Sequence, residues 1–175
     1  PFVYLSSDSL GIKGIEPNHV LSMNQSLLKE LEEIRSHSAV EAGMEKMVDE
    51  AKLAPAVPKL AIVSEPQDYV TSDGKKISKD EVDLVAKMVS MGRFHRTFAG
   101  SGLYNLAAAV LLPGTLPNQI ARNTDNRKDG VVRIGHPEGI AEVRASLTTD
   151  GQDVAFVGLE RTARRIIKGD LYIPR

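Results

Sequence analysis

The sequence contains no cysteine and no tryptophan, and aromatic residues make up only 5% of its 175 positions. The absence of cysteine excludes disulfide bonds, zinc–thiolate sites and thiol nucleophiles within this chain. Because a chain without cysteine suits a reducing compartment, we expect a cytoplasmic location.

The chain also lacks a dominant charge and a long hydrophobic run. Its formal net charge of −1 gives no general attraction to nucleic acid or to an anionic membrane surface. No apolar stretch approaches the length of about 20 residues that a membrane-spanning helix needs. We therefore expect neither a nucleic-acid nor a membrane partner. A hydrophobic content of 42% is enough for the core of about one domain.

The most informative stretch is Met91–Gly114, MGRFHRTFAGSGLYNLAAAVLLPG. It predicts a glycine-containing turn at Gly100–Gly102 and a helix from about Leu103 to Leu112. Since this helix has no polar face, we expect it to be buried on all sides. The unpaired amides at a helix start favour an anion, and glycines permit its close approach. The pattern indicates either an ordinary tight turn or a carboxylate or phosphate site.

The rest of the chain reads as one helical region and several short strands. Asn24 is suited as the N-cap of a helix that begins near Gln25, and the apolar phase changes between Ser36 and Gly43, which predicts a break. Asp73-Gly74 predicts a hairpin turn. Apolar runs predict strands at Pro1–Leu5, Pro58–Ser64, Glu81–Val89, Asn118–Ala121, Val131–Gly135, Ile140–Leu147 and Val154–Leu159.

These elements predict an α+β fold in which a curled sheet wraps around the central buried helix. Arg161–Ile173 fits either a basic helix or a strand, a turn and a strand. The basic side chains in it suit a solvated strand or ion pairs within the molecule, because nucleic-acid binding needs a wider basic surface.

Several familiar catalytic motifs are absent. Ser101 is not in a nucleophile elbow, because Ala99 and Leu103 stand where that motif has glycines. Gly74-Lys75-Lys76 lacks the other residues of a phosphate-binding P-loop. The four histidines are scattered, so we expect no metal site.

Polar residues gather just before the central helix, at Ser90, Arg93, His95 and Arg96. An arginine can hold a carboxylate with two hydrogen bonds, and a histidine can donate to it or shuttle a proton. The plainer alternative is that His95 satisfies a backbone carbonyl. His136, in the sequence Ile-Gly-His-Pro, is more typical of a turn than of a catalyst.

Four stretches resemble the PrpF-type isomerases, in the same order. Ser90–Thr115 resembles the family's Ser-Met-Gly-Arg-x-His-Arg run, with the helix that ends in Leu-Pro-Gly-Thr. Pro1–Tyr4 is similar to a strand that follows an Asn-Pro junction. Val132–Gly139 resembles the Arg-Ile-Gly-His-Pro-Ser-Gly turn, and Arg161–Arg165 with Gly169 resembles the C-terminal Arg-Thr-Ala-Arg-Arg strand.

The resemblance implies a diaminopimelate epimerase-like fold, in which two similar barrel-like halves each enclose a helix. Residues 1–175 would be the C-terminal half, which agrees with a start at Pro1 in an apolar run. The missing N-terminal half would then be a partner, and Leu171–Arg175 could pack on it. Members of the family use no metal or organic cofactor. The number of associating copies stays open, and a homo-oligomer is compatible with the sequence.

The implied activity is an isomerase or tautomerase that moves a proton and a double bond in an unsaturated di- or tricarboxylate. Aconitate, methylitaconate and oxalomesaconate are the substrate types. The family's lysine and cysteine for proton transfer would lie in the other half, so this chain would be inactive alone. The substrate-facing residues implied here are Ser90, Met91, His95, Gly100, Ser101 and Gly102, with His95 as an auxiliary proton donor.

Two departures from the family's commoner pattern leave the size of the substrate open. Gly100-Ser101 replaces a bulkier residue followed by threonine, and Glu138 replaces a serine. A non-catalytic carboxylate-binding or interaction domain with the same fold is the alternative function. A relative in fold alone, such as a phenazine-biosynthesis-type isomerase, fits the turn at Ile134–Gly139 less well.

Overall fold

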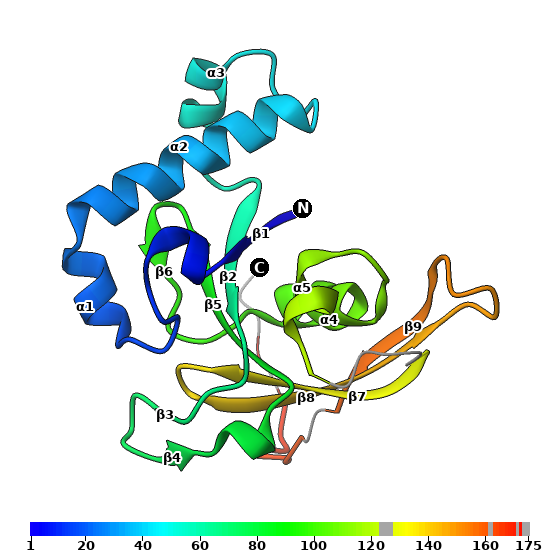
Figure 1. Ribbon diagram of the computed structural model, residues 1–175. Coiled ribbons are helices and arrows are strands. Elements are labelled where there is room, and N and C mark those ends of the chain that lie inside the picture. The colour runs from blue at the N-terminus through cyan, green and yellow to red at the C-terminus, as the bar shows by residue number, and fades with distance from the viewer. Residues whose placement is uncertain (123–127, 161–162, 171, 173–175) are drawn as a thin grey trace.

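The computed structural model describes residues 1–122, 128–160, 163–170 and 172 (Figure 1). The strands are β1 (Phe2–Ser6), β2 (Lys59–Ser64), β3 (Tyr69–Val70), β4 (Lys76–Ile77), β5 (Leu84–Ser90), β6 (Arg93–Phe94), β7 (Asp129–His136), β8 (Gly139–Leu147) and β9 (Val154–Leu159). The α-helices are α1 (Asn18–Met23), α2 (Gln25–Glu41), α3 (Val48–Leu53), α4 (Gly100–Leu111) and α5 (Leu116–Ile120), and short 3-10 turns cover Asp8–Leu10 and Lys79–Glu81.

One mixed sheet organises the molecule, with the strand order β1-β2-β5-β7-β8-β9 and with β6 paired to β5. β1 and β2 are parallel, as are β5 and β7, whereas the pairs β2–β5, β7–β8 and β8–β9 are antiparallel. The hairpin β3–β4 forms a separate two-stranded ribbon. This topology confirms the mixed α+β class.

The sheet carries helices on both faces (Figure 1). On β2, Leu60 and Ile62 pack against α1 and α2, whereas Ala61 and Val63 face α4. Successive side chains of a strand point to opposite faces, so an uninterrupted apolar run is what a doubly covered strand needs. The expected buried strand at Pro58–Ser64 is confirmed.

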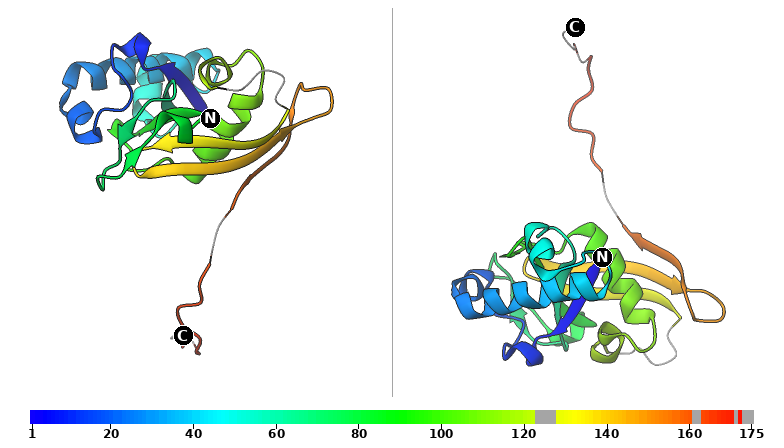
Figure 2. Two further views of the ribbon diagram at one scale, coloured as in Figure 1. Left: turned by 60° about the horizontal axis from the view of Figure 1, so that its bottom comes forward. Right: turned by 90° about the horizontal axis from the view of Figure 1, so that it is seen from above.

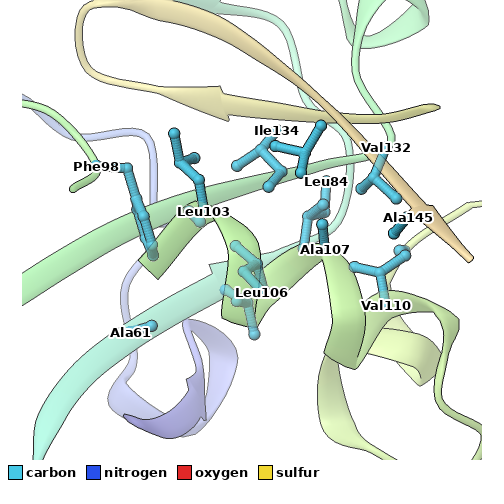
Figure 3. Close-up of a cluster of buried hydrophobic side chains, with 14 of the residues drawn as sticks. Ala61, Leu84, Phe98, Leu103, Leu106, Ala107, Val110, Val132, Ile134 and Ala145 are labelled. Carbon is cyan, nitrogen blue, oxygen red and sulfur yellow. The ribbon is translucent and has the colours of Figure 1, made fainter. Parts of the chain in front are cut away.

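α4 lies against the inner face of the curled sheet, and its side chains interlock with those of four strands (Figure 3). Leu106, Ala107 and Val110 are fully buried there. β7, β8 and β9 bend around the helix, as the two views of Figure 2 show. The predicted helix is confirmed, although it begins at Gly100 rather than Leu103. The expectation that it is buried on all sides is wrong, because Ser101 and Asn105 lie on an exposed side.

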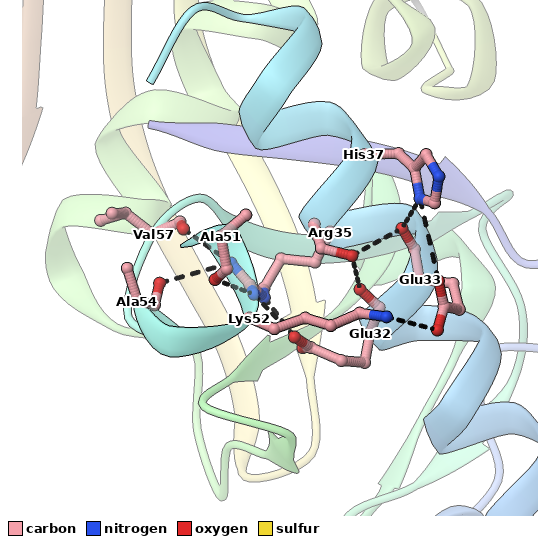
Figure 4. Close-up of polar contacts among 9 residues, drawn as sticks. Glu32, Glu33, Arg35, His37, Ala51, Lys52, Ala54 and Val57 are labelled. Carbon is pink, nitrogen blue, oxygen red and sulfur yellow. Dashed lines mark hydrogen bonds and ion pairs between the residues drawn. The ribbon is translucent and has the colours of Figure 1, made fainter. Parts of the chain in front are cut away.

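The helical region on the other face is tied together by Arg35 of α2, which is only 3% exposed (Figure 4). Its guanidinium donates to the backbone carbonyls of Ala51 (2.6 Å) and Val57 (2.8 Å) and to both carboxylate oxygens of Glu32. The side chain of Asn24 caps α2 by accepting from Leu27 N, as predicted. The expected break follows Glu41, where α2 ends.

One predicted strand is wrong. Asn118–Ala121 falls largely in helix α5, which begins after Thr115. The Thr115 hydroxyl accepts a hydrogen bond from Asn118 N at 3.2 Å, and Pro117 stands in the first turn, where its missing N–H costs nothing. This N-cap signal outweighs the short apolar run. The strands expected near Glu81–Val89, Val131–Gly135, Ile140–Leu147 and Val154–Leu159 are confirmed.

The C-terminal segment forms neither the helix nor the strands considered for it, over the part that is described. Residues 163–168 have no regular secondary structure, are exposed, and lead away from the body of the molecule (Figure 2). Arg161, Thr162, Leu171 and residues 173–175 lie outside the described residues. No helix in the described part of the chain is both long and apolar enough to cross a membrane.

Candidate functional site

The first turn of α4 presents backbone amides without a side-chain cap. Ala99 is the N-cap residue, its side chain cannot accept a hydrogen bond, and the first bond within the helix runs from Leu103 N to Ala99 O at 2.9 Å. Gly100 is half-buried and Ser101 is exposed. The positive end of the helix dipole therefore reaches the surface at Gly100 and Ser101, where it favours a negatively charged group.

Gly102 has a packing role that the sequence alone did not indicate. A Cβ atom there would lie 2.7 Å from Cε1 of Phe98 and 2.9 Å from Cζ of Phe2, closer than carbon atoms can approach. The two rings stack with their centroids 6.4 Å apart. The missing side chain at Gly102 thus lets two aromatic rings close over the helix. Its assignment as a substrate-facing residue stays a prediction, as do those of Gly100 and Ser101.

Ser90 and Met91 form the end of β5 and its turn into β6. Met91 has a φ of 52° and Gly92 one of 70°, so this two-residue turn has the left-handed backbone of a tight hairpin. By strand alternation Ser90 follows Leu84, Ala86 and Met88 and faces the α4 side.

The strand register brings the end of β5 and the start of α4 to the same end of the sheet. Leu60 of β2 pairs with Val89, and the preceding Lys59 pairs with Phe2 of β1. The ring of Phe2 packs next to Gly102, in the space that a Cβ atom would occupy. Ser90 on β5 is therefore level with Lys59 on the neighbouring strand β2 and with Phe2 on β1, the strand beyond it. Its side chain is on the face of the sheet that carries α4.

His95 lies in the loop between β6 and α4, and its ring is exposed. Its Nδ1 is 2.8 Å from the carbonyl oxygen of Thr97 and 3.3 Å from the backbone N–H of Thr97, and one ring nitrogen can serve only one of the two. The shorter contact favours the tautomer in which Nδ1 donates to the carbonyl and Nε2 carries the lone pair. The expectation that His95 satisfies a backbone carbonyl is met. The exposed Nε2 remains able to contact a ligand.

The arginine expected to hold a carboxylate is engaged inside this chain. Arg96 Nε donates to Glu138 Oε1 at 3.1 Å, and the hydrogen bond from Arg96, with a further one from Ser72, lowers the pKa of Glu138. Arg96 is exposed, so this pair is a weak contact. It links the loop before α4 to the turn between β7 and β8. Arg93 is exposed on β6.

Sequence reasoning missed one buried charge, Lys87, in the middle of β5. This lysine is 4% exposed, and burial lowers its pKa to about 8, although the charge of Glu16 acts in the opposite direction. The signal was present, because a lysine interrupts the otherwise apolar run Leu84–Val89. A buried amine that forms no ion pair within the described residues is a candidate for function.

The remaining predicted groups fall outside this region. Arg164, Arg165 and Lys168 are exposed. His136 ends β7 at a turn, as its sequence context indicates, and burial lowers its pKa. Within the described ranges, no three histidine, aspartate or glutamate side chains come together as metal ligands would.

Comparison with known proteins gives a match along the whole chain. A family model described as "PrpF protein" matches residues 1–174. The 3-methylitaconate isomerase of Eubacterium barkeri is 39% identical over 177 residues, which is all of this chain and 46% of that protein. The 2-methyl-aconitate isomerases of Shewanella oneidensis and Cupriavidus necator are 30% and 32% identical, over 100% and 99% of this chain and 44% of each protein.

The fold has a matching crystal structure. A methylitaconate-delta-isomerase superimposes with a TM-score of 0.86 at 38% identity, over 97% of this chain and 43% of that one. This chain therefore spans a little under half the length of the curated relatives that it matches.

Proposed function

Because this chain belongs to the PrpF family, we propose that it is the C-terminal half of a cofactor-independent isomerase that acts on unsaturated di- or tricarboxylates. The observation that carries the proposal is the match over its entire length to isomerases of methylitaconate and methylaconitate. The matched relatives are about twice as long, which supports a second half that completes the substrate site. Aconitate, methylitaconate and oxalomesaconate are the substrate types that we propose for the whole protein.

The role proposed for this half is to hold a carboxylate and to stabilise developing charge. When a base removes a proton next to a carboxylate, negative charge spreads onto the carboxylate oxygens. Amides aimed at that position stabilise the charge without reorganisation, as an oxyanion hole does. The amides of Gly100 and Ser101 are suited to this, since Ser101 is exposed and the helix start has no side-chain cap.

Ser90, Met91, Gly102 and His95 complete the proposed substrate-facing edge. The free Nε2 of His95 would accept a hydrogen bond when the ring is neutral, and it would act as the auxiliary proton donor only after it has taken up a proton. In this chain the absence of cysteine removes any thiol acid or base, so the main proton-transfer groups would lie in the other half. The fragment alone is therefore expected to be inactive.

A proline at Gly100 tests the amide role directly. Gly100 is the first residue of α4, where proline fits a helix, and the preceding Ala99 already has the extended conformation that proline requires (φ −63°, ψ 145°). Gly100→Pro therefore removes one N–H and keeps the helix, whereas Gly100→Ala keeps the N–H and serves as the matched control. Loss of one oxyanion donor lowers kcat on the order of 100-fold.

The assay uses the full-length protein with cis- and trans-aconitate, methylitaconate and oxalomesaconate, and follows the ultraviolet absorbance of the conjugated alkene. We expect turnover of at least one acid, strongly reduced in Gly100→Pro and little changed in Gly100→Ala. Equal rates in the two variants would refute the amide role. Binding of these acids without any turnover would instead favour the non-catalytic carboxylate-binding domain.

A further inference from the structure

A cavity with several polar lining residues lies on the face of the sheet opposite α4. It has a volume of about 260 Å³ and is enclosed by residues 14–19, by residues 69–72 of the β3–β4 ribbon and by the end of β7, with Val85 and Lys87 of β5 among its lining residues. By strand alternation Lys87 points away from Leu84, Ala86 and Met88, which pack on α4. The cavity is therefore separate from the helix start discussed above.

Lys87 places at this cavity an ammonium group that lacks some of its hydrogen-bond partners. Its ammonium has three N–H donors, and one of them donates to Asn18 Oδ1 at 3.1 Å. Among the described residues, no carboxylate forms an ion pair with it. The Asn18 side chain is held in place because its Nδ2 donates to the carbonyl of His95 at 2.9 Å. A buried ammonium in this state gains from a bound anion.

Glu16 supplies an unsatisfied acceptor in the same wall. Its Oε1 accepts from Lys13 N at 2.7 Å, whereas its Oε2 is buried and has no hydrogen-bond partner among the described residues. Burial alone would raise the pKa of Glu16, but nearby backbone amides and the charge of Lys87 lower it overall, so the carboxylate is ionised. The structure thus leaves this ionised carboxylate with an unused acceptor position, and Glu16 is a lining residue of the cavity.

His136 contributes a neutral donor. Its Nδ1 accepts from the backbone N–H of Glu138 at 3.2 Å, so Nε2 carries the proton of the neutral ring. His136 lines the cavity, as does the hydroxyl-bearing Ser72. The lining residues thus supply an ammonium, an imidazole N–H and a carboxylate, a set that matches a ligand with one anionic end and one donor beside it.

We propose that this cavity is a second small-molecule site, which binds a compact α-hydroxy or α-amino acid with its carboxylate on Lys87 and its hydroxyl or ammonium group on the carboxylate of Glu16. At about 30 Å³ for each water-sized group, the space holds roughly eight non-hydrogen atoms. Glu16 repels a second carboxylate, so the di- and tricarboxylates proposed for the α4 site are poor ligands here.

The test uses the full-length protein with L-lactate, L-alanine and propionate, which lacks the donor, in titration calorimetry and saturation-transfer NMR. We expect lactate or alanine to bind more tightly than propionate. Lys87→Met should weaken this binding by at least about tenfold, because it removes the charged donor. Glu16→Gln, which keeps the side-chain volume, should weaken the preference over propionate and gives a second readout if Lys87→Met does not fold.

Two controls locate the binding. Lys76→Met removes an exposed lysine of β4 in the same ribbon and should leave affinity unchanged. Gly100→Pro alters the α4 site and should also leave it unchanged, so failure of the proposed isomerase would not affect this result. The proposal is overturned if neither lactate nor alanine binds at high millimolar concentration, if Lys87→Met binds them as well as wild type, or if Gly100→Pro abolishes binding.

Discussion

Replacing Arg35 by methionine should destabilise the protein more than any change of a surface arginine. The guanidinium joins three segments, because it donates to Glu32 in α2, to Ala51 O in α3 and to Val57 O just before β2 (Figure 4). α3 packs on α2 around this contact. Methionine preserves much of the volume but supplies no donor.

The size of the effect follows from the groups left without partners. Loss of the guanidinium leaves the carbonyl of Val57 without its donor, whereas the carbonyl of Ala51 keeps the hydrogen bond from Ala54 N at 3.1 Å. A hydrogen bond from a charged donor contributes about 1.5–3 kcal/mol. Glu32 is partly exposed and can be rehydrated, so its loss adds less. We expect the free energy of unfolding to fall by about 2–4 kcal/mol, because the carbonyl of Val57 loses its donor and the carbonyl of Ala51 loses one of two.

Urea denaturation followed by far-ultraviolet circular dichroism measures this change, since the chain has no tryptophan to report by fluorescence. The matched control is Arg133→Met, which breaks a pair with Glu142 in which both side chains are at least half exposed. A surface pair of this kind contributes at most about 1 kcal/mol. If Arg35→Met were no more destabilising than Arg133→Met, the reasoning from buried carbonyls would be refuted.

Two further predictions concern Gly102 and Lys87. Gly102→Ala should lower the free energy of unfolding by about 1 kcal/mol, because the clash of the new methyl group with the rings of Phe2 and Phe98 outweighs the better helix propensity of alanine. Ser101→Ala, at the adjacent exposed position, is the control and should not lower it. For Lys87, a folded-state pKa of about 8 against 10.5 means that the unfolded chain binds more protons between these values, so stability should rise with pH across that window by roughly 3 kcal/mol. The difference between wild type and Lys87→Met in denaturation from pH 7 to pH 10 isolates this contribution, and equal slopes would contradict it.

Local patterns predicted those elements whose sequence signal agrees with their packing. β2 is covered on both faces and therefore needed an uninterrupted apolar run, which the sequence has at Leu60–Val63. The apolar positions of α4 pack on strands and on α5, whereas Ser101 and Asn105 lie on its exposed side. Asn24 was recognisable as a cap because its side chain bonds within three residues along the chain.

Features that depend on distant contacts were not predictable. Nothing near Gly102 in the sequence indicates that Phe2 will pack on it, because the contact arises from the pairing of β1 with β2. Lys87 is adjacent to Glu16 only once residues 14–19 fold over β5. The helix at Leu116–Ile120 was missed because its five residues are too few to show a helical period, and the Thr115 cap was the better signal.

β5 lies between two neighbouring strands, with one layer of side chains above it and another below. This position determines how the molecule unfolds. Its amides are bonded to β2 on one side and, near Leu84, to β7 on the other. The amides of Val85 and Lys87 face β2 in the middle of the sheet, so their exchange should report complete unfolding. The outer edges at β1 and β9 have one neighbour each and should exchange first.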